Sequence, residues 1–227
     1  MTDHEVVRTH YSATANAVYW FVRGAVAFLA KVLFRHKIEG KEHLPATGAY
    51  IIAPSHRSNL DGFMMSTISR RRTRFMAKDS LWGNRPSGWF FTTMGGFPVD
   101  REHADRQALR ACGEVIEMGY PLIVFPEGQR REGPLIENLY QGPSYLAHRY
   151  GIPIVPIGIG GSATAMPVGA KYLRPHPIEF IIGEPIVVAP GEKRAKRSEI
   201  EATTAELQKR LQELFDEAQR RVGTPNE

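Results

Sequence analysis

His56 and Asp61 are the two side chains whose types and spacing best suit catalysis in this sequence. They follow the apolar run Tyr50–Pro54, which is typical of a buried strand that ends in a turn. Ser58 or Asn59 can cap a helix that begins near Asp61, so the pair can touch across the helix start. A carboxylate on one imidazole nitrogen fixes the tautomer and makes the other nitrogen a better base. The alternative is a histidine packed under a turn, with Asp61 as a helix-start charge.

A second loop with residues that could bind or react with a substrate follows another apolar run, Pro121–Phe125, which predicts a buried strand. This loop holds a carboxylate, Glu127, a glycine, Gly128, and a cation, Arg130. Glycine lets the backbone come close to a ligand, and arginine can make a two-pronged contact with a phosphate. The alternative is a surface turn with a local salt bridge, which contributes little to stability.

Length and composition restrict the possible functions. A chain of 227 residues with 42% hydrophobic residues fits one globular domain with a real core. Cys112 is the one cysteine, so an internal disulfide is excluded, in agreement with a reducing compartment. The formal charge of +5 indicates anionic partners. A nucleic-acid partner is disfavoured, because the basic residues lie at predicted helix ends and loops rather than along one recognition helix. The sequence holds no zinc-type Cys/His cluster and no Walker A loop, and we expect no metal site.

The segment Val18–Phe34 is mostly apolar and predicts a helix lying in a membrane interface. Asn16 and Arg23 share one face of this helix and leave most of the remainder apolar. Tyr19 and Trp20 are the expected interfacial anchors. A spanning helix needs about 20 uninterrupted apolar residues, so a true span is disfavoured. The remaining alternative is an amphipathic helix packed on the core of the protein.

The remaining elements alternate between strand and helix patterns, which predicts an α/β domain with a mixed, largely parallel sheet flanked by helices. Strands are expected at residues 50–54, 73–78, 95–101, 121–125, 153–159, 178–182 and 185–188, and helices at 59–69, 103–118 and 140–150. The composition of residues 81–94 favours an apolar wall or a membrane-facing loop over a regular helix or strand. The C-terminal helix is amphipathic and begins with a capping box formed by Ser198 and Glu201. We divide the chain into a membrane-interface helix, residues 1–35, and a catalytic domain, residues 36–227.

Four segments stand in an order that is similar to the four blocks of a known family. They are Ser-His-Arg-Ser-Asn-Leu-Asp at 55–61, Gly-Phe-Pro-Val-Asp-Arg at 96–101, Phe-Pro-Glu-Gly-Gln-Arg at 125–130 and Ile-Val-Pro-Ile at 154–157. Together they resemble the glycerolipid acyltransferase family, and most closely its bacterial 1-acylglycerol-3-phosphate acyltransferases. The resemblance extends over about residues 35–190, and the first and third segments carry its specificity.

The resemblance implies acyl transfer from acyl-CoA, or from an acyl carrier protein thioester, to the free hydroxyl of 1-acylglycerol-3-phosphate, which gives phosphatidic acid. His56 would be the general base and Asp61 the residue that orients it. An alcohol is a poor nucleophile until a base takes its proton during the attack. A thioester needs neither a metal nor a further cofactor to be attacked, so the thioester co-substrate suffices.

The resemblance also implies which residues bind the acceptor. Glu127, Gly128 and Arg130 match the acceptor-binding block, and Lys78 and Arg101 would hold the acceptor phosphate together with Arg130. The supporting positions are Ser58, Asn59 and Pro156. The N-terminal helix is similar to the membrane anchor of the family. It would make the protein a peripheral or monotopic membrane protein that draws lysolipid from the cytoplasmic leaflet, at the cytoplasmic face of the cell membrane.

Three positions depart from the family pattern. Ser55 precedes the histidine where the family often has Asn, Gln129 stands where Thr or Ser is common, and Gln141 replaces a basic residue before Gly142. These departures leave the exact acceptor open, and another lysophospholipid or a glycolipid is the alternative. Two other functions remain at this point, hydrolysis of a thioester or ester and a non-enzymatic membrane-binding module.

Overall fold

The computed structural model describes residues 7, 11–99, 105–188 and 195–226. Within these residues, seven strands form one sheet in the order β1-β7-β6-β2-β5-β3-β4. The strands are β1 (Lys37–Glu39), β2 (Ile51–Pro54), β3 (Arg74–Lys78), β4 (Gly96–Val99), β5 (Leu122–Ile123), β6 (Ile154–Gly160) and β7 (Glu179–Ile182). All neighbours pair in parallel except β6 and β7, which are antiparallel. The predicted mixed, largely parallel sheet is therefore confirmed.

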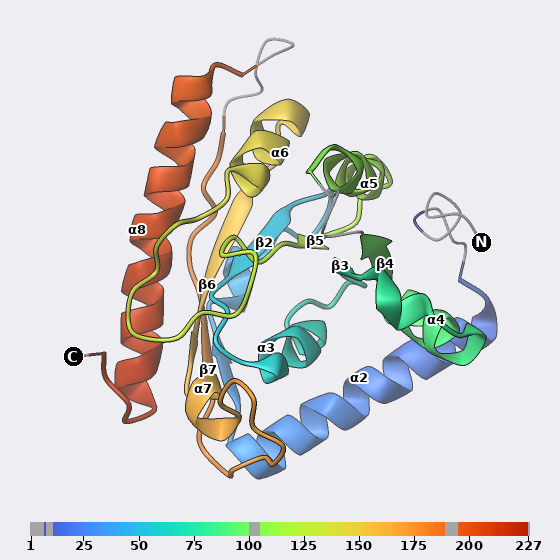
Figure 1. Cartoon of the computed structure of the whole chain (residues 1–227), viewed down its shortest axis with the longest axis vertical. Coiled ribbons are helices and arrows are strands. Elements are labelled where there is room, and N and C mark those ends of the chain that lie inside the picture. The colour runs from blue at the N-terminus through green and yellow to red at the C-terminus, as the bar shows by residue number, and fades with distance from the viewer. Residues whose placement is uncertain (1–6, 8–10, 100–104, 189–194, 227) are drawn as a thin grey trace.

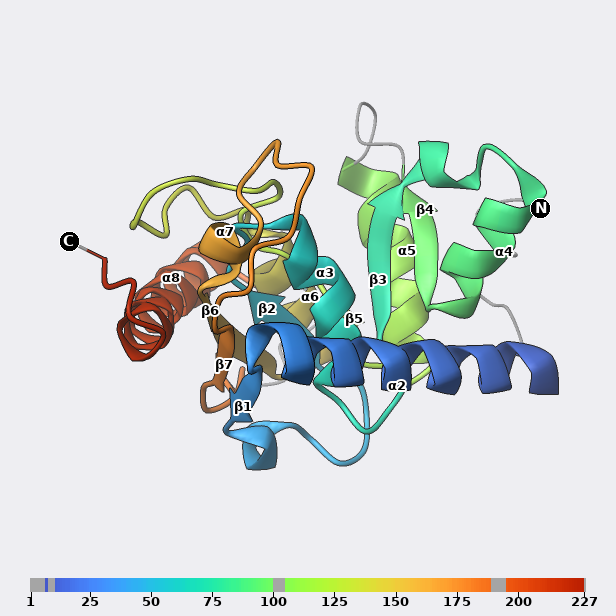
Figure 2. The same cartoon turned by 90° about the horizontal axis from the view of Figure 1, so that it is seen from below.

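Helices cover both faces of this sheet (Figures 1 and 2). They are α2 (Ala13–Phe34), α3 (Asn59–Met64), α4 (Arg85–Thr93), α5 (Asp105–Glu117), α6 (Gly142–Tyr150), α7 (Ser162–Ala165) and α8 (Arg197–Arg221). Helices α5, α6 and α8 pack against one face and α2 and α3 against the other. Such an arrangement is the one expected when parallel strands are linked by crossover helices.

Strand β2 occupies the centre of the molecule because both of its faces are apolar. Ile51 and Ala53 point into the core shared with α5, α6 and α8, whereas Tyr50 and Ile52 point into the core shared with α2 and α3. Alternate residues of a strand face opposite sides of a sheet, so this apolar run is buried from both sides. The carboxyl end of β2 is held rigidly in consequence, and His56 follows directly after it.

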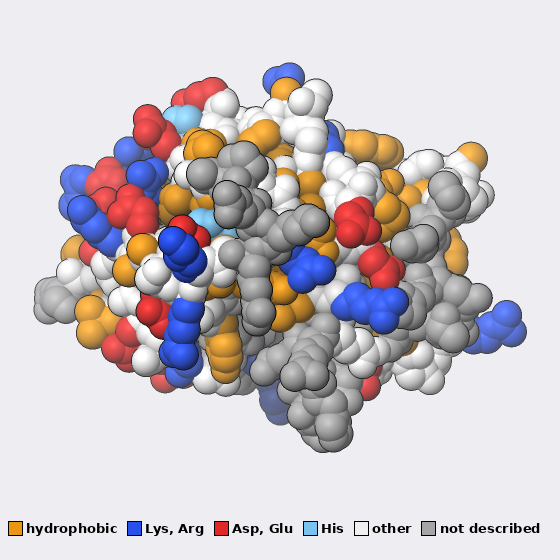
Figure 3. Space-filling model, turned by 90° about the horizontal axis from the view of Figure 1, so that it is seen from above, with side chains coloured by type: hydrophobic (Ala, Val, Ile, Leu, Met, Phe, Trp, Pro, Cys, Tyr) orange, Lys and Arg blue, Asp and Glu red, His pale blue; other side chains and the backbone are white. Residues whose placement is uncertain are grey.

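Helix α8 lies unusually close to β6 because the strand carries glycines where the helix crosses it. A Cβ atom at Gly158 would come within 2.2 Å of the backbone of Leu214, and one at Gly160 within 2.3 Å of the backbone of Ala218. The predicted apolar stripe of α8 is buried here, with Leu207, Leu211, Phe215 and Ala218 all inaccessible. Around α8, at the left of Figure 3, acidic and basic side chains intermingle, as expected for a solvated helix face.

Helix α2 turns Arg23 and Asn16 toward the protein and most of its large apolar side chains outward. The Arg23 guanidinium donates to the backbone carbonyls of Ser66 and Ser69 at 2.9 and 2.6 Å. The Asn16 Oδ1 accepts a hydrogen bond from Arg72 at 2.8 Å. The exposed large side chains of the helix are mostly apolar or aromatic, and they are Trp20, Phe21, Phe28, Leu29, Val32 and Leu33, together with the charged Lys31. This orientation is the reverse of that of a surface helix in a water-soluble protein.

Two details of the α2 prediction need correction. Tyr19 is fully buried, with the Arg72 guanidinium 3.9 Å from the centre of its ring, so it is not an exposed anchor, whereas Trp20 is 46% exposed. The helix is also longer than the predicted apolar run. Its 22 residues and mean hydropathy of 1.6 make it long and apolar enough to cross a membrane by length and composition alone. The length of the helix is therefore no argument against a helix that spans the membrane.

Other elements also differ from the sequence prediction. Residues 85–93 form α4 rather than an irregular wall, because Asn84 caps the helix and Pro86 occupies its first turn. The short strand β1 was not predicted. Residues 185–188 contribute only the isolated bridge at Ile186. Helix α8 begins at Arg197, and the carboxylate of Glu199 accepts the backbone N–H of Lys196, so the predicted capping box at Ser198 is wrong.

Candidate active site

His56 and Asp61 are in contact in the loop that joins β2 to α3. The Nδ1 atom of His56 lies 3.0 Å from Oδ2 of Asp61. The same oxygen accepts the backbone N–H groups of Arg57 and Ser58, each at 2.7 Å. Ser58 is the N-cap of α3, which places Asp61 in the first turn of that helix. A fully buried carboxylate with three donors is held in one position, so it can hold the imidazole in one orientation.

The His56 ring has one nitrogen committed to Asp61 and one that remains available. The ring stacks on Phe125 with the ring centres 4.0 Å apart, and its side chain is 18% exposed. Within the described residues, Nε2 of His56 makes no hydrogen bond. With Nδ1–H donating to the Asp61 carboxylate, the lone pair of Nε2 can accept a proton from a substrate hydroxyl.

The backbone of His56 is fixed on both sides by the loop that follows β5. Its N–H donates to Oε2 of Glu127 at 2.8 Å, and its carbonyl accepts the backbone N–H of Arg131 at 2.9 Å. The Arg57 guanidinium donates to Oε1 of Glu127 and, at 3.1 Å, to the same carbonyl of His56. Glu127 and Arg57 are both almost completely buried. The Glu127 carboxylate, predicted to contact the acceptor, is thus occupied by groups of the protein itself.

The other predicted acceptor-binding residues lie around this loop. Gly128 has a φ of +69°, and a Cβ there would lie 2.4 Å from the Tyr140 ring, so both conformation and space require glycine. Arg130 is exposed in the same loop, and Lys78 is exposed at the end of β3, the strand that neighbours β5. Arg101 lies outside the described residues.

The supporting residues lie near His56 or within the sheet that carries it. Ser58 donates its hydroxyl to the carbonyl of Met166 at 2.8 Å, and Asn59 is the exposed first residue of α3. Pro156 is buried in β6 opposite Ala53, three residues before His56. The supporting roles of Ser58, Asn59 and Pro156 in the site stay predictions.

Sequence reasoning did not identify Ser55 and Arg57 as functional. The Ser55 hydroxyl accepts the backbone N–H of Ile159 at 3.0 Å, and it joins the ends of β2 and β6. Arg57 anchors Glu127 beneath His56. One signal was available in the sequence. Arg57 lies between His56 and Asp61, and an arginine that is buried at such a position needs a carboxylate partner.

Metal and thiol chemistry find no support among the described residues. Within residues 11–99, 105–188 and 195–226, no group of three His, Cys, Asp or Glu side chains could hold a metal ion. Burial raises the pKa of the Cys112 thiol to about 12. A thiol that stays protonated at neutral pH is a poor nucleophile, so Cys112 is a core residue.

An apolar crevice of about 50 Å³ lies between α2, α3 and α4. Its apolar walls are formed by Val22, Val26, Phe63, Phe75, Phe90, Phe91, Met94 and Ile123. Ile123 and Phe75 belong to β5 and β3, so the crevice reaches from the outward-facing helix to the sheet that carries the site. It therefore lies on the same face of the sheet as α2.

Comparisons with known proteins identify the family of the chain. A family model described as acyltransferase matches residues 35–160. A 1-acyl-sn-glycerol-3-phosphate acyltransferase of Bacillus subtilis is 26% identical over 198 residues, which are 87% of this chain and 96% of that protein. A chloroplastic 1-acyl-sn-glycerol-3-phosphate acyltransferase of Brassica napus is 27% identical over 67% of this chain, which spans only 45% of that relative.

A solved structure shows the same fold. The crystal structure of the 1-acyl-sn-glycerophosphate acyltransferase PlsC from Thermotoga maritima has a TM-score of 0.72 and 23% identity, and the match covers 92% of this chain and 85% of that one. The matched family segment is more than half of the chain and contains His56, Asp61 and the Glu127–Arg130 loop. The chain belongs to the acyltransferase family, and it is an O-acyltransferase.

Proposed function

We propose that the protein transfers an acyl group from a thioester donor to the free hydroxyl of 1-acylglycerol-3-phosphate and so forms phosphatidic acid. The observation that carries the proposal is the His56–Asp61 pair, with Nδ1 at 3.0 Å from the carboxylate and Nε2 available. The names of the relatives from Bacillus subtilis and Brassica napus support this choice of acceptor.

In the proposed reaction, Nε2 of His56 takes the hydroxyl proton while the hydroxyl oxygen attacks the thioester carbonyl carbon. A carbon–oxygen bond forms, the carbon–sulfur bond then breaks, and the imidazolium returns its proton to the departing thiolate. The Asp61 carboxylate stabilises the imidazolium that forms between these steps. Because the acceptor hydroxyl attacks directly, no nucleophilic residue of the protein is required.

The acceptor phosphate would be held by Lys78, Arg101 and Arg130. Lys78 and Arg130 follow neighbouring strands, β3 and β5, at the end of the sheet where His56 follows β2. Ligands of parallel sheets bind beyond the carboxyl ends of the strands, which favours this location. An exposed arginine can bind a phosphate with two parallel hydrogen bonds.

The lipid acceptor would reach the site from a membrane surface. Helix α2 presents an apolar outer face while Arg23 fixes its inner face to the protein. Membrane association is consistent with the lipid-synthesising relatives, and the α2 orientation favours a helix that lies along the surface. We place the enzyme at the cytoplasmic face, because a charged acyl-CoA or acyl carrier protein donor does not cross a bilayer.

Acyl transfer from a labelled acyl-CoA to a panel of acceptors tests this function. The panel contains 1-acylglycerol-3-phosphate, other lysophospholipids, a glycolipid and a reaction with no acceptor. We expect phosphatidic acid as the main product, and a kcat reduced roughly 10²–10⁴-fold in His56→Ala. His148→Ala is the matched control, because His148 contacts Thr203 on α8 and is remote from Asp61.

Three results would reject parts of the proposal. Preference for another acceptor would reject the assignment of 1-acylglycerol-3-phosphate. Release of free fatty acid without an acceptor would identify hydrolysis. Near-normal turnover in His56→Ala, with unchanged circular dichroism, would reject the general-base mechanism.

A further inference from the structure

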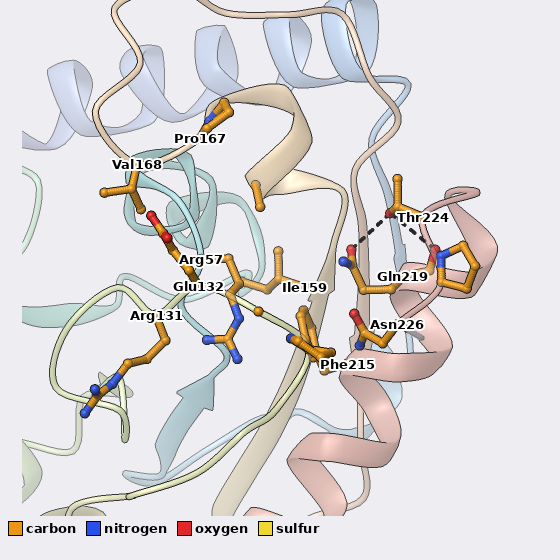
Figure 4. A pocket seen from close by; sticks show the side chains of 14 residues that line it. Arg57, Arg131, Glu132, Ile159, Pro167, Val168, Phe215, Gln219, Thr224 and Asn226 are labelled. Carbon is orange, nitrogen blue, oxygen red and sulfur yellow. Dashed lines mark hydrogen bonds between the residues drawn. The ribbon is translucent and has the colours of Figure 1, made fainter.

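A cavity of about 440 Å³ is lined by Arg57, the residue that follows the candidate catalytic histidine (Figure 4). Its walls come from Arg57 after β2, from residues 131–134 in the loop after β5, from Ile159 in β6, from Ala163 in α7, and from Phe215, Gln219 and residues 224–226 at the end of α8 and after it. Cavities of about 300–1,000 Å³ are typical of small-molecule sites. Among the described residues, none of those assigned to the acceptor above lines this cavity.

Arg57 supplies the first reason to regard the cavity as a binding site. Its side chain is 2% exposed, and it lines the cavity with its guanidinium 4.8 Å from the centre of the Phe215 ring. The Nη atoms are engaged by Glu127, by the His56 carbonyl and, at 2.9 Å, by the Leu135 carbonyl. The Nε atom is buried and has no partner in the described part of the chain. A buried donor without a partner is costly, so a ligand that supplies an acceptor would bind favourably.

The charge of Arg57 also restricts what this ligand can be. Glu127 already neutralises the guanidinium in a buried ion pair. What remains on Arg57 is one directed N–H at Nε and one at Nη2, rather than an uncompensated positive charge. Such a donor suits the carbonyl oxygen of an amide better than a phosphate, which would place a second anion beside the buried carboxylate.

Gln219 supplies a second donor on the opposite wall. Its Oε1 accepts the backbone N–H of Gly161 at 2.6 Å and the hydroxyl of Thr224 at 3.3 Å. Its Nε2 makes no hydrogen bond among the described residues. Between the two donors the wall is apolar, with Ile159 and Phe215. The cavity therefore matches a slender molecule that alternates amide carbonyls with methyl and methylene groups.

The cavity adjoins the proposed acceptor site but does not include the residues assigned to it. Lys78 and Arg130 do not line the cavity, although residues 131–134, which directly follow Arg130, form one of its walls beside β6 and α8. Direct transfer between two substrates requires both to be bound at once, so the donor needs a place apart from the acceptor phosphate.

We propose that this cavity binds the pantetheine arm of the acyl thioester donor. CoA and acyl carrier protein share this arm, whose two amides, hydroxyl and gem-dimethyl group fit the donors and apolar walls described above. The inference rests on the proposed acyl transfer and adds where the donor sits. Arg57 would donate through Nε to one amide carbonyl of the arm and Gln219 through Nε2 to the other.

The test fills the cavity without altering the catalytic loop. Ala163→Trp places a large side chain in the cavity, and Thr164→Trp is the matched control, because Thr164 is the exposed next residue and is not a wall of the cavity. We expect Ala163→Trp to raise the KM for acyl-CoA about tenfold or more while the KM for the lipid acceptor stays the same. Calorimetry should show that free CoA binds the wild type and Thr164→Trp but not Ala163→Trp.

Three acyl donors test whether the cavity recognises the pantetheine arm itself. Acyl-CoA and acyl carrier protein both carry pantetheine, whereas the acyl thioester of N-acetylcysteamine lacks most of it. Ala163→Trp should impair the first two donors and spare the third. An unchanged donor KM, a rise confined to the acceptor KM, or equal impairment with all three donors would overturn the inference. Failure of the proposed function looks different: the wild type then transfers to no acceptor, while the loss of CoA binding in Ala163→Trp still reports on the cavity.

Discussion

The Glu127 carboxylate accepts the backbone N–H of His56 at 2.8 Å, although the two residues are 71 positions apart in the chain. The other oxygen of this carboxylate receives the Arg57 guanidinium. The first and third segments of the family resemblance are therefore one structural unit, in which the loop after β5 holds the loop after β2. A charge-assisted hydrogen bond to buried backbone is a strong constraint on the position of the imidazole.

Glu127→Gln should destabilise the protein and reduce kcat. The amide keeps the shape of the side chain but leaves the buried Arg57 without a counter-charge, and breaking a buried ion pair costs about 3–5 kcal/mol. Urea unfolding measures the free energy of unfolding, and steady-state kinetics measures kcat. Glu137→Gln removes the charge of an exposed glutamate in the same loop and serves as the control. If Glu127→Gln behaved like this control, the buried pair would have no part in holding His56.

Asp61→Asn should lose most of kcat with little change in KM. The amide can hold the imidazole in the wrong tautomer, and it no longer stabilises the imidazolium. Because Oδ2 of Asp61 also accepts the N–H groups of Arg57 and Ser58, circular dichroism and urea unfolding must accompany the kinetics. A variant that folds normally and turns over at the full rate would reduce Asp61 to a capping residue of α3.

Arg130→Ala should raise the KM for the phosphorylated acceptor by roughly tenfold, because a charge-assisted hydrogen bond contributes about 1.5–3 kcal/mol. Arg130→Lys should restore only part of the affinity, since an ammonium cannot reproduce the two-pronged contact. The control is Arg197→Ala, which removes an exposed cation at the start of α8. A rise in the donor KM instead of the acceptor KM would assign Arg130 to the donor.

Much of the fold could be predicted because its signals are local. The apolar run before His56 indicates a strand buried from both sides, and the helical spacing of Leu207, Leu211 and Phe215 indicates the buried stripe of α8. The contact of His56 with Asp61 could also be predicted, because both residues belong to one loop and one helix start.

The remaining features depend on contacts between distant segments. Nothing local to Glu127 shows that its partner is Arg57, and nothing local to Tyr19 shows that its ring lies under Arg72. Gly158 and Gly160 appear as loop-forming residues in the sequence, yet they lie within β6 and allow α8 to approach. The same limitation led to the wrong prediction for residues 81–94, where two glycines and one proline concealed a helix capped by Asn84.

His36 should make the protein less stable in mild acid. Burial lowers the pKa of His36 below 6.5, with smaller opposing influences from its bond to the Ile178 carbonyl and from Glu179. Between the folded and unfolded pKa values the unfolded chain binds more protons, so the free energy of unfolding falls as pH drops through about 6.5 and levels off below the folded pKa. Urea unfolding at several pH values should therefore show a smaller acid loss for His36→Asn than for the wild type. Parallel curves for the two proteins would exclude His36 as the cause.

Single substitutions on the outer face of α2 should weaken membrane binding without disturbing the fold. Phe21 is 77% exposed, and Val187, far along the chain after β7, is 80% exposed. Burying a phenylalanine side chain contributes about 1.5–3 kcal/mol, so Phe21→Asp should reduce partitioning into liposomes roughly ten- to hundredfold, as measured by flotation. Val187→Asp introduces the same charge at an equally exposed apolar position and should bind like the wild type. Urea unfolding should show equal stability for both variants, because neither side chain is in the core. Equal flotation of the two variants would mean that α2 does not face the lipid, and its exposed apolar surface would then require a protein partner.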